Sequence, residues 1–128
     1  MLIGELSRKS GCSVRAIRYY EELGIIAVPE RSDRGHRTYT EQHCHELTVI
    51  RCFRVAQMGV RDIKEVMDAI RGITRPSSLG VCMEKLAHHR SELVRWQKEI
   101  KAAQLMIDRK LHALELRIAE AEQGTPKS

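Results

Sequence analysis

The amino-acid sequence predicts a mainly helical protein, in which a compact N-terminal unit is followed by one long helix. Short amphipathic stretches separated by glycine-containing turns fill residues 1–75. A segment rich in Arg, Pro and Ser then interrupts the pattern at 75–78. Residues 79–121 contain one glycine and no proline, and their apolar residues recur at heptad spacing. Since proline ends a helix and the heptad repeat marks a helix seam, these observations divide the chain into two parts.

The composition narrows the class of protein. Aromatic residues make up 4% and charged residues 30% of the 128 residues, so any core is thin and helices that associate are favoured over a large globule. The net charge of +5 suits an anionic partner such as nucleic acid. The four cysteines show no regular spacing, and no apolar run resembles a signal peptide or membrane span. We therefore expect a reduced, cytoplasmic protein with no membrane partner.

Residues 3–24 form the first motif, two short helices joined by a tight turn. Gly11 can adopt a positive φ in this turn, and Ser13 can cap the second helix by accepting a hydrogen bond from a backbone N–H near Arg15 or Ala16. The apolar residues face inward at helical spacing, which leaves three side chains pointing outward: Arg15, Arg18 and Tyr19. A cationic outer face predicts a helix-turn-helix that enters a DNA groove. The alternative is a helical hairpin with a solvated charged face.

A hairpin, or wing, is predicted after Gly24. Residues 25–28 are apolar and predict a short strand or an extended connector, whereas residues 32–35 have turn chemistry and 37–39 fit a return strand. The tip, residues 31–37, holds three arginines in seven residues. Such a tip is placed to contact phosphates, although a solvated basic loop is the alternative. Helices are then expected over 41–58 and 60–73, which completes a winged helix-turn-helix domain over residues 1–75.

The heptad positions of the last segment predict a helix about 60 Å long at 1.5 Å per residue. A single helix of this length cannot bury its own apolar stripe, so we expect a second copy of the chain as its partner. The dimerisation residues at this seam are predicted to be Leu86, His89, Leu93, Trp96, Ile100, Ala103 and Ile107. One extra four-residue step follows Ile107, and residues 122–128 are expected to form a flexible tail.

Taken in order, these motifs resemble the MerR family of transcriptional regulators. The resemblance rests on residues 3–6 (IGEL), 14–26 (VRAIRYYEELGII), 34–39 (RGHRTY), and the Glu46-Leu47 and Ile50-Arg51 pairs. It implies a long helix that pairs antiparallel in a coiled-coil homodimer. It also implies a non-enzymatic regulator that binds a pseudo-palindromic promoter operator and shares the promoter with RNA polymerase. Such a dimer activates or represses transcription by distorting the DNA in response to an effector.

The resemblance also assigns DNA contacts. Arg15, Arg18 and Tyr19 would contact DNA from the second helix, and Tyr39 resembles a phosphate contact in the wing. The full set of candidate DNA-binding residues is Ser13, Val14, Arg15, Arg18, Tyr19, Tyr20, Arg34, Gly35, His36, Arg37 and Tyr39. An arginine can make a bidentate pair with guanine, so Arg18 is the first candidate for a base contact.

The effector is less well specified by the sequence. Metal-sensing members place a cysteine at the start of the long helix, where Cys82 stands, and His112 could approach it from an antiparallel partner. A metal ion is therefore one candidate effector, and simple packing of Cys82 is the alternative. Cys52, between Arg51 and Arg54, suggests a thiol-based sensor or a packed helix residue.

Two other classes of protein compete with a regulator. The first is an inducer-independent architectural or excisionase-like protein with a similar winged domain. The second is an enzyme, which the sequence disfavours because it shows no nucleophile–base set, phosphate loop or complete metal triad.

Overall fold

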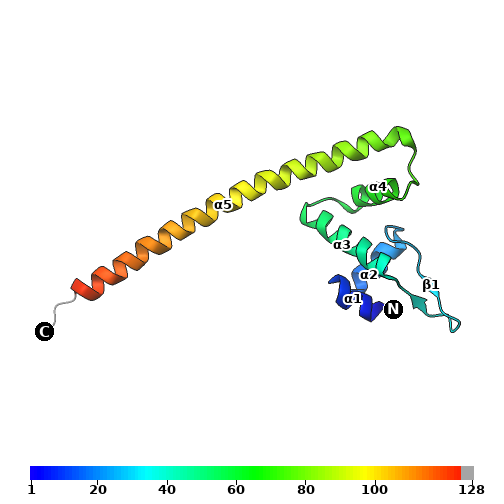
Figure 1. The fold of residues 1–128 in the computed structure, drawn as a ribbon, viewed down its shortest axis with the longest axis horizontal. Coiled ribbons are helices and arrows are strands. Elements are labelled where there is room, and N and C mark those ends of the chain that lie inside the picture. The colour runs from blue at the N-terminus through cyan, green and yellow to red at the C-terminus, as the bar shows by residue number, and fades with distance from the viewer. Residues whose placement is uncertain (125–128) are drawn as a thin grey trace. The chain divides into compact units, whose positions relative to one another are not determined.

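The computed structural model describes residues 1–124 and is mainly helical. The helices are α1 (Ile3–Ser10), α2 (Val14–Glu22), α3 (Glu41–Val55), α4 (Val60–Ile70) and α5 (Leu79–Gly124), with a 3-10 turn, η1, at Pro76–Ser78. A two-stranded antiparallel sheet, β1 (Glu30–Arg31) and β2 (Arg37–Thr38), lies between α2 and α3 (Figure 1). The order of elements is therefore the predicted winged helix-turn-helix followed by a long helix.

The chain divides into two compact units, one formed by Met1–Arg90 and the other beginning at Ser91. The first unit thus includes the start of α5, whereas the sequence places the boundary near residue 75. Two side chains account for this difference. Cys82 of α5 is buried with its Sγ 3.9 Å from the Glu65 carbonyl oxygen in α4, and Lys85 Nζ lies 3.1 Å from Asp62 and 2.6 Å from Glu65.

The core of the first unit is aliphatic. Its fully buried apolar side chains come from α1 to α4, from the connector that follows α2 and from the turn between α3 and α4: Leu6, Ile17, Ile25, Ile26, Leu47, Ile50, Met58, Ile63 and Val66. The connector supplies two of them, Ile25 and Ile26, without forming a strand, because β1 begins only at Glu30. The extended-connector reading of residues 25–28 is therefore the one that the structure adopts.

Helix ends differ from the predicted bounds where the backbone turns. The turn between α1 and α2 has Gly11 at φ +72°, and Ser13 caps α2 by accepting a 3.0 Å hydrogen bond from the Ala16 N–H, as expected. Helix α3 ends at Val55 rather than at 58, because Gln57 takes a φ of 61° and Met58 turns into the core. Helix α4 ends at Ile70 rather than at 73, because Gly72 has a φ of 78°.

A buried polar cluster joins the connector to α3 and to the end of α4. Glu46 is 4% exposed, accepts a 3.1 Å hydrogen bond from the Ala27 N–H, and is paired with Arg71, which also donates to the Ile25 carbonyl. His43, also buried, places Nε2 2.9 Å from the Ala27 carbonyl oxygen and accepts from the Thr40 N–H. Cys44 of the same helix is half-buried, whereas His43 and Glu46 are buried.

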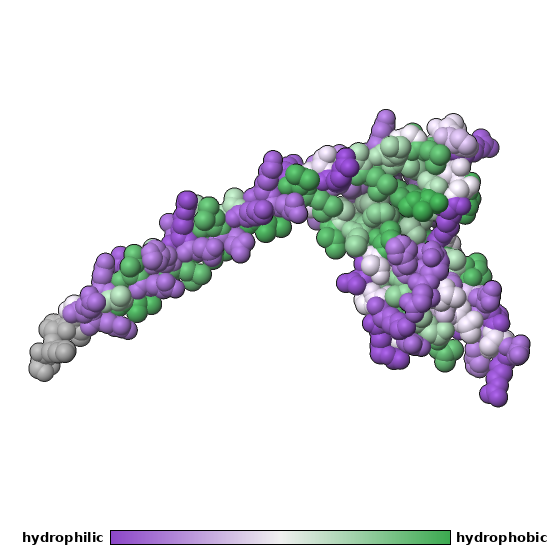
Figure 2. Space-filling view, in the orientation of Figure 1, coloured by the Kyte–Doolittle hydropathy of each residue, from purple (hydrophilic) through white to green (hydrophobic). Residues whose placement is uncertain are grey.

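Helix α5 continues to Gly124, three residues past the expected end at 121, and the rest of the expected tail, 125–128, lies outside the described residues. From residue 97 to residue 124 every side chain is exposed. Apolar and charged side chains alternate over this part of the surface (Figure 2). None of the helices within residues 1–124 is long and apolar enough to cross a membrane.

Candidate nucleic-acid interface

The exposed face of α2 carries the cationic and aromatic residues that the sequence predicts. Ile17 is completely buried, and this fixes the rotation of the helix so that Arg15 and Arg18 are exposed. Tyr19 is 48% exposed, and its ring lies 5.9 Å from that of the half-buried Tyr20. These side chains line a shallow hollow of about 560 Å³ on one flank of the helix, together with Val14 and Glu22.

The wing is a short hairpin with a tight tip. Its strands pair Glu30 with Thr38 and Arg31 with Arg37. Gly35 takes a φ of +83° at the tip and donates a 2.8 Å hydrogen bond to the Ser32 carbonyl. Backbone hydrogen bonds of 2.7 Å also join Tyr39 to Met1 in both directions. The wing is thus anchored at its base and exposed at its tip.

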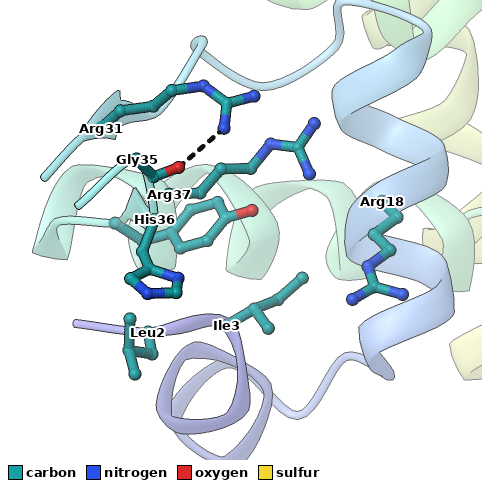
Figure 3. Close-up of a pocket in the computed structure, with 8 residues that line it drawn as sticks. Leu2, Ile3, Arg18, Arg31, Gly35, His36 and Arg37 are labelled. Carbon is teal, nitrogen blue, oxygen red and sulfur yellow. Dashed lines mark hydrogen bonds between the residues drawn. The ribbon is translucent and has the colours of Figure 1, made fainter.

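The helix and the wing share a second hollow, of about 360 Å³. Arg18 reaches it from α2, and Arg31, His36 and Arg37 reach it from the wing, with Leu2 and Ile3 at the start of α1 (Figure 3). Arg31 is held by a 2.9 Å hydrogen bond from Nη1 to the Gly35 carbonyl. Three guanidinium groups around one open hollow form a site for an anion with several oxygens, such as a backbone phosphate.

Tyr39 supports this surface from behind. The residue is 3% exposed, and its hydroxyl donates a 2.8 Å hydrogen bond to Oε1 of Glu21. Burial, followed by this hydrogen bond, raises the pKa of Tyr39 to about 12, so the hydroxyl keeps its proton near neutral pH. The hydroxyl proton of Tyr39 is thus engaged by Glu21, and the residue also lines the hollow shared by the helix and the wing, so its contact with a phosphate stays a prediction.

Some of the other predicted DNA-binding residues are exposed, and others cap a helix or are half-buried. Arg34, Gly35 and His36 are exposed in the wing. Ser13 acts as the helix cap, and Val14 and Tyr20 are half-buried. Sequence reasoning did not single out Glu21, whose two carboxylate oxygens contact the wing, because spacing along one helix does not reveal a partner that is distant in the chain. Arg31 belongs to the wing tip that the sequence predicts to contact phosphates, although it is not in the set of candidate DNA-binding residues.

The predicted dimerisation residues become more exposed along α5. Leu86 and His89 lie in the first unit and are half-buried, as are Leu93 and Trp96 at the start of the second. The later positions Ile100, Ala103 and Ile107 are exposed. The exposed large apolar side chains that continue the seam are Leu111, Leu114 and Ile118.

The predicted effector residues lie in different units. Cys82 is 8% exposed and lines a hollow of about 390 Å³ with Lys85, Asp68 and Glu65. His112 is exposed, with Nδ1 3.9 Å from Glu115. No group of three or more His, Cys, Asp or Glu side chains among residues 1–124 of a single chain is arranged to hold a metal ion. Cys52 is exposed.

This arrangement defines the class of protein. A capped second helix with an exposed cationic face, followed by a hairpin whose arginines meet it at one hollow, is a winged helix-turn-helix. The chain belongs to the MerR family, because residues 1–70 match the model of the MerR HTH family regulatory proteins. The resemblance stated from the sequence is therefore confirmed.

Individual relatives agree with this assignment. The chain is 36% identical over 78 residues to the HTH-type transcriptional regulator CueR of Salmonella typhi, covering 61% of this chain and 56% of that protein. It is 39% identical over 89 residues to the HTH-type transcriptional regulator HmrR of Sinorhizobium medicae, covering 68% of this chain and 60% of the relative. The matches thus span somewhat more than half of these proteins.

A solved structure of a MerR family transcriptional regulator from Listeria monocytogenes is similar over almost the whole chain. The TM-score is 0.76 at 25% identity, with 97% of this chain and 92% of that one covered. The likeness extends beyond the 70 residues of the family model.

Proposed function

We propose that this protein binds double-stranded promoter DNA as a homodimer and regulates transcription. The observation that carries the proposal is the convergence of Arg18 from α2 with Arg31 and Arg37 from the wing around one open hollow. Two elements that are separate in sequence thereby present positive charge on the same side of the domain. This is the arrangement that a groove-binding helix and a phosphate-binding wing require.

The roles of the two elements differ in this proposal. Arg15, Arg18 and Tyr19 lie on the exposed face of α2 and reach base edges or the phosphates beside them. The wing arginines contact the sugar–phosphate backbone, which fixes the register of the helix without reading the sequence. Tyr39 and Ser13 hold these elements in place.

The homodimer is supported by the exposed apolar seam of α5. Ile100 and Ile107 are 65% and 60% exposed, and a second copy of the same stripe would remove both from water. Two copies of α2 would then face one pseudo-palindromic operator. The curated relatives CueR and HmrR are transcriptional regulators, which supports regulation at a promoter shared with RNA polymerase over a purely architectural role.

The test begins by selecting duplexes from a random DNA library with the wild-type protein. Arg18→Ala should then weaken binding to the selected duplex by about 5- to 150-fold, which corresponds to about 1–3 kcal/mol for a base or paired phosphate contact. Arg90→Ala is the matched control, since it removes the same charge from an exposed position on α5. Affinity is measured by fluorescence anisotropy at fixed salt, and dimerisation by sedimentation.

Failure of the wild-type protein to select any duplex would overturn DNA binding. Equal affinities for Arg18→Ala and the wild-type protein would overturn the assignment of the site.

A further inference from the structure

Glu21 is an acidic residue in the middle of a cationic surface. It lies near the end of α2, but its side chain is only 13% exposed and faces the wing rather than the solvent. Each carboxylate oxygen has its own partner. Tyr39 donates its hydroxyl to Oε1 at 2.8 Å, and Arg37 places Nε 3.1 Å from Oε2.

The contact through Nε determines which N–H donors of Arg37 remain available to bind a phosphate. A guanidinium group has five N–H donors in a fixed plane, and the ion pair with Glu21 engages the inner edge of that plane. Arg37 remains 47% exposed and lines the hollow that it shares with Arg18 and Arg31. Figure 3 shows its side chain extending from the wing toward α2, the helix that carries Arg18.

A carboxylate at this place is unfavourable for DNA binding on charge alone. It lowers the local positive potential and repels a phosphate, so charge alone predicts that removing it strengthens binding. The position of Glu21 therefore requires a benefit that outweighs this repulsion. The geometry offers one, because Glu21 makes both the hydrogen bond and the ion pair recorded between side chains of α2 and those at the wing within the described residues.

We propose that Glu21 is a positioning residue for DNA binding, which holds Arg37 by its Nε so that its terminal nitrogens face the phosphate hollow beside Arg18. Tyr39 fixes the carboxylate from the other side. An arginine that is already ordered loses less conformational freedom when a phosphate arrives, and this is the source of the gain. The inference rests on the proposed DNA binding, and it adds a residue that does not itself touch the DNA.

The decisive variant is Glu21→Gln, because positioning and charge predict opposite signs. Positioning predicts that affinity for the selected duplex falls about 10-fold and that the slope of log K against log salt becomes shallower by about 0.9, the value of one lost phosphate contact. Glu84→Gln is the matched control, since it removes the same charge from an exposed position on α5, outside the candidate DNA-binding surface. This control should bind as tightly as the wild-type protein or more tightly.

A double-mutant cycle with Arg37→Ala separates positioning from a general structural role. If Glu21 acts through Arg37, Glu21→Gln should cause no further loss of affinity in the Arg37→Ala background. A second variant, Arg37→Lys, keeps the charge but has one ammonium group that cannot both pair with Glu21 and face a phosphate. It should weaken binding as much as Arg37→Ala does, and it tests the inference even if Glu21→Gln fails to fold.

The outcomes are distinct for the two proposals. Wild-type or tighter binding by folded Glu21→Gln, an additive loss in the cycle, or full binding by Arg37→Lys would overturn the role of Glu21. Those results would not contradict the proposed DNA binding, provided that Arg18→Ala still weakens binding to the selected duplex. Unchanged binding by Arg18→Ala would instead overturn the site itself.

Discussion

The first unit and the later part of α5 differ in how far their apolar side chains are buried. In Met1–Arg90, the aliphatic side chains of α1 to α4 pack against one another and against Ile25 and Ile26 of the connector. In α5 from residue 97 to residue 124, no side chain is buried. Burial of each large aliphatic side chain stabilises by about 1.5–3 kcal/mol. The first unit gains this stabilisation within one chain, whereas α5 can gain it only from a partner.

Substitutions in the two regions should therefore have different effects. Changes in the first unit should alter the stability of the folded domain. Changes at the α5 seam should alter association and leave the domain folded.

The largest effect is expected at the seam. Ile107→Asp places one carboxylate per chain where the proposed dimer buries an aliphatic side chain, and an unpaired buried charge costs several kcal/mol per ion. The dimer dissociation constant should rise by at least about a thousand-fold, which sedimentation equilibrium can measure. Ala102→Asp adds the same charge to the opposite side of α5 and should leave the dimer intact. A dimer of unchanged affinity in Ile107→Asp would contradict the predicted seam.

The next effect is expected inside the first unit. Arg71→Ala leaves the buried Glu46 carboxylate without its cation, and breaking such a pair costs about 3–5 kcal/mol. Chemical denaturation should show this loss in the free energy of unfolding. The exposed pair of Arg95 with Glu92, 2.5 Å apart, is the comparison, and Arg95→Ala should cost at most about 1 kcal/mol. Equal costs for the two variants would mean that Glu46 is not buried in solution.

The smallest effect is a pH dependence at the base of the wing. The pKa of Tyr39 is raised from 10 to about 12 because its hydroxyl is buried and donates to Glu21. The folded state therefore retains the proton while the unfolded state loses it, so this residue lowers the free energy of unfolding as pH rises from 10 to 12. Tyr39→Phe should show a shallower decline over that range in thermal melts. Identical slopes would show that the hydroxyl ionises freely in the folded protein.

The sequence by itself predicted the order of the elements because local signals specify them. Gly11 and Ser13 determine the turn and cap of the helix-turn-helix, and both behave as their chemistry requires. The heptad spacing as far as Ile107 predicted one long helix, since a sustained 3.5-residue repeat marks a helix seam. The outward direction of Arg15 and Arg18 followed from the helical period.

Tertiary structure decided which polar groups meet, and therefore which residues form the surface and which support it. Tyr39, expected at the DNA, is buried, because docking of the wing on α2 brings its hydroxyl to Glu21. Glu46 is buried because Arg71, distant in the chain, folds back onto it. Helical periodicity gives the direction of a side chain but not the charge that faces it, and a buried carboxylate is stable only where that opposing charge is present.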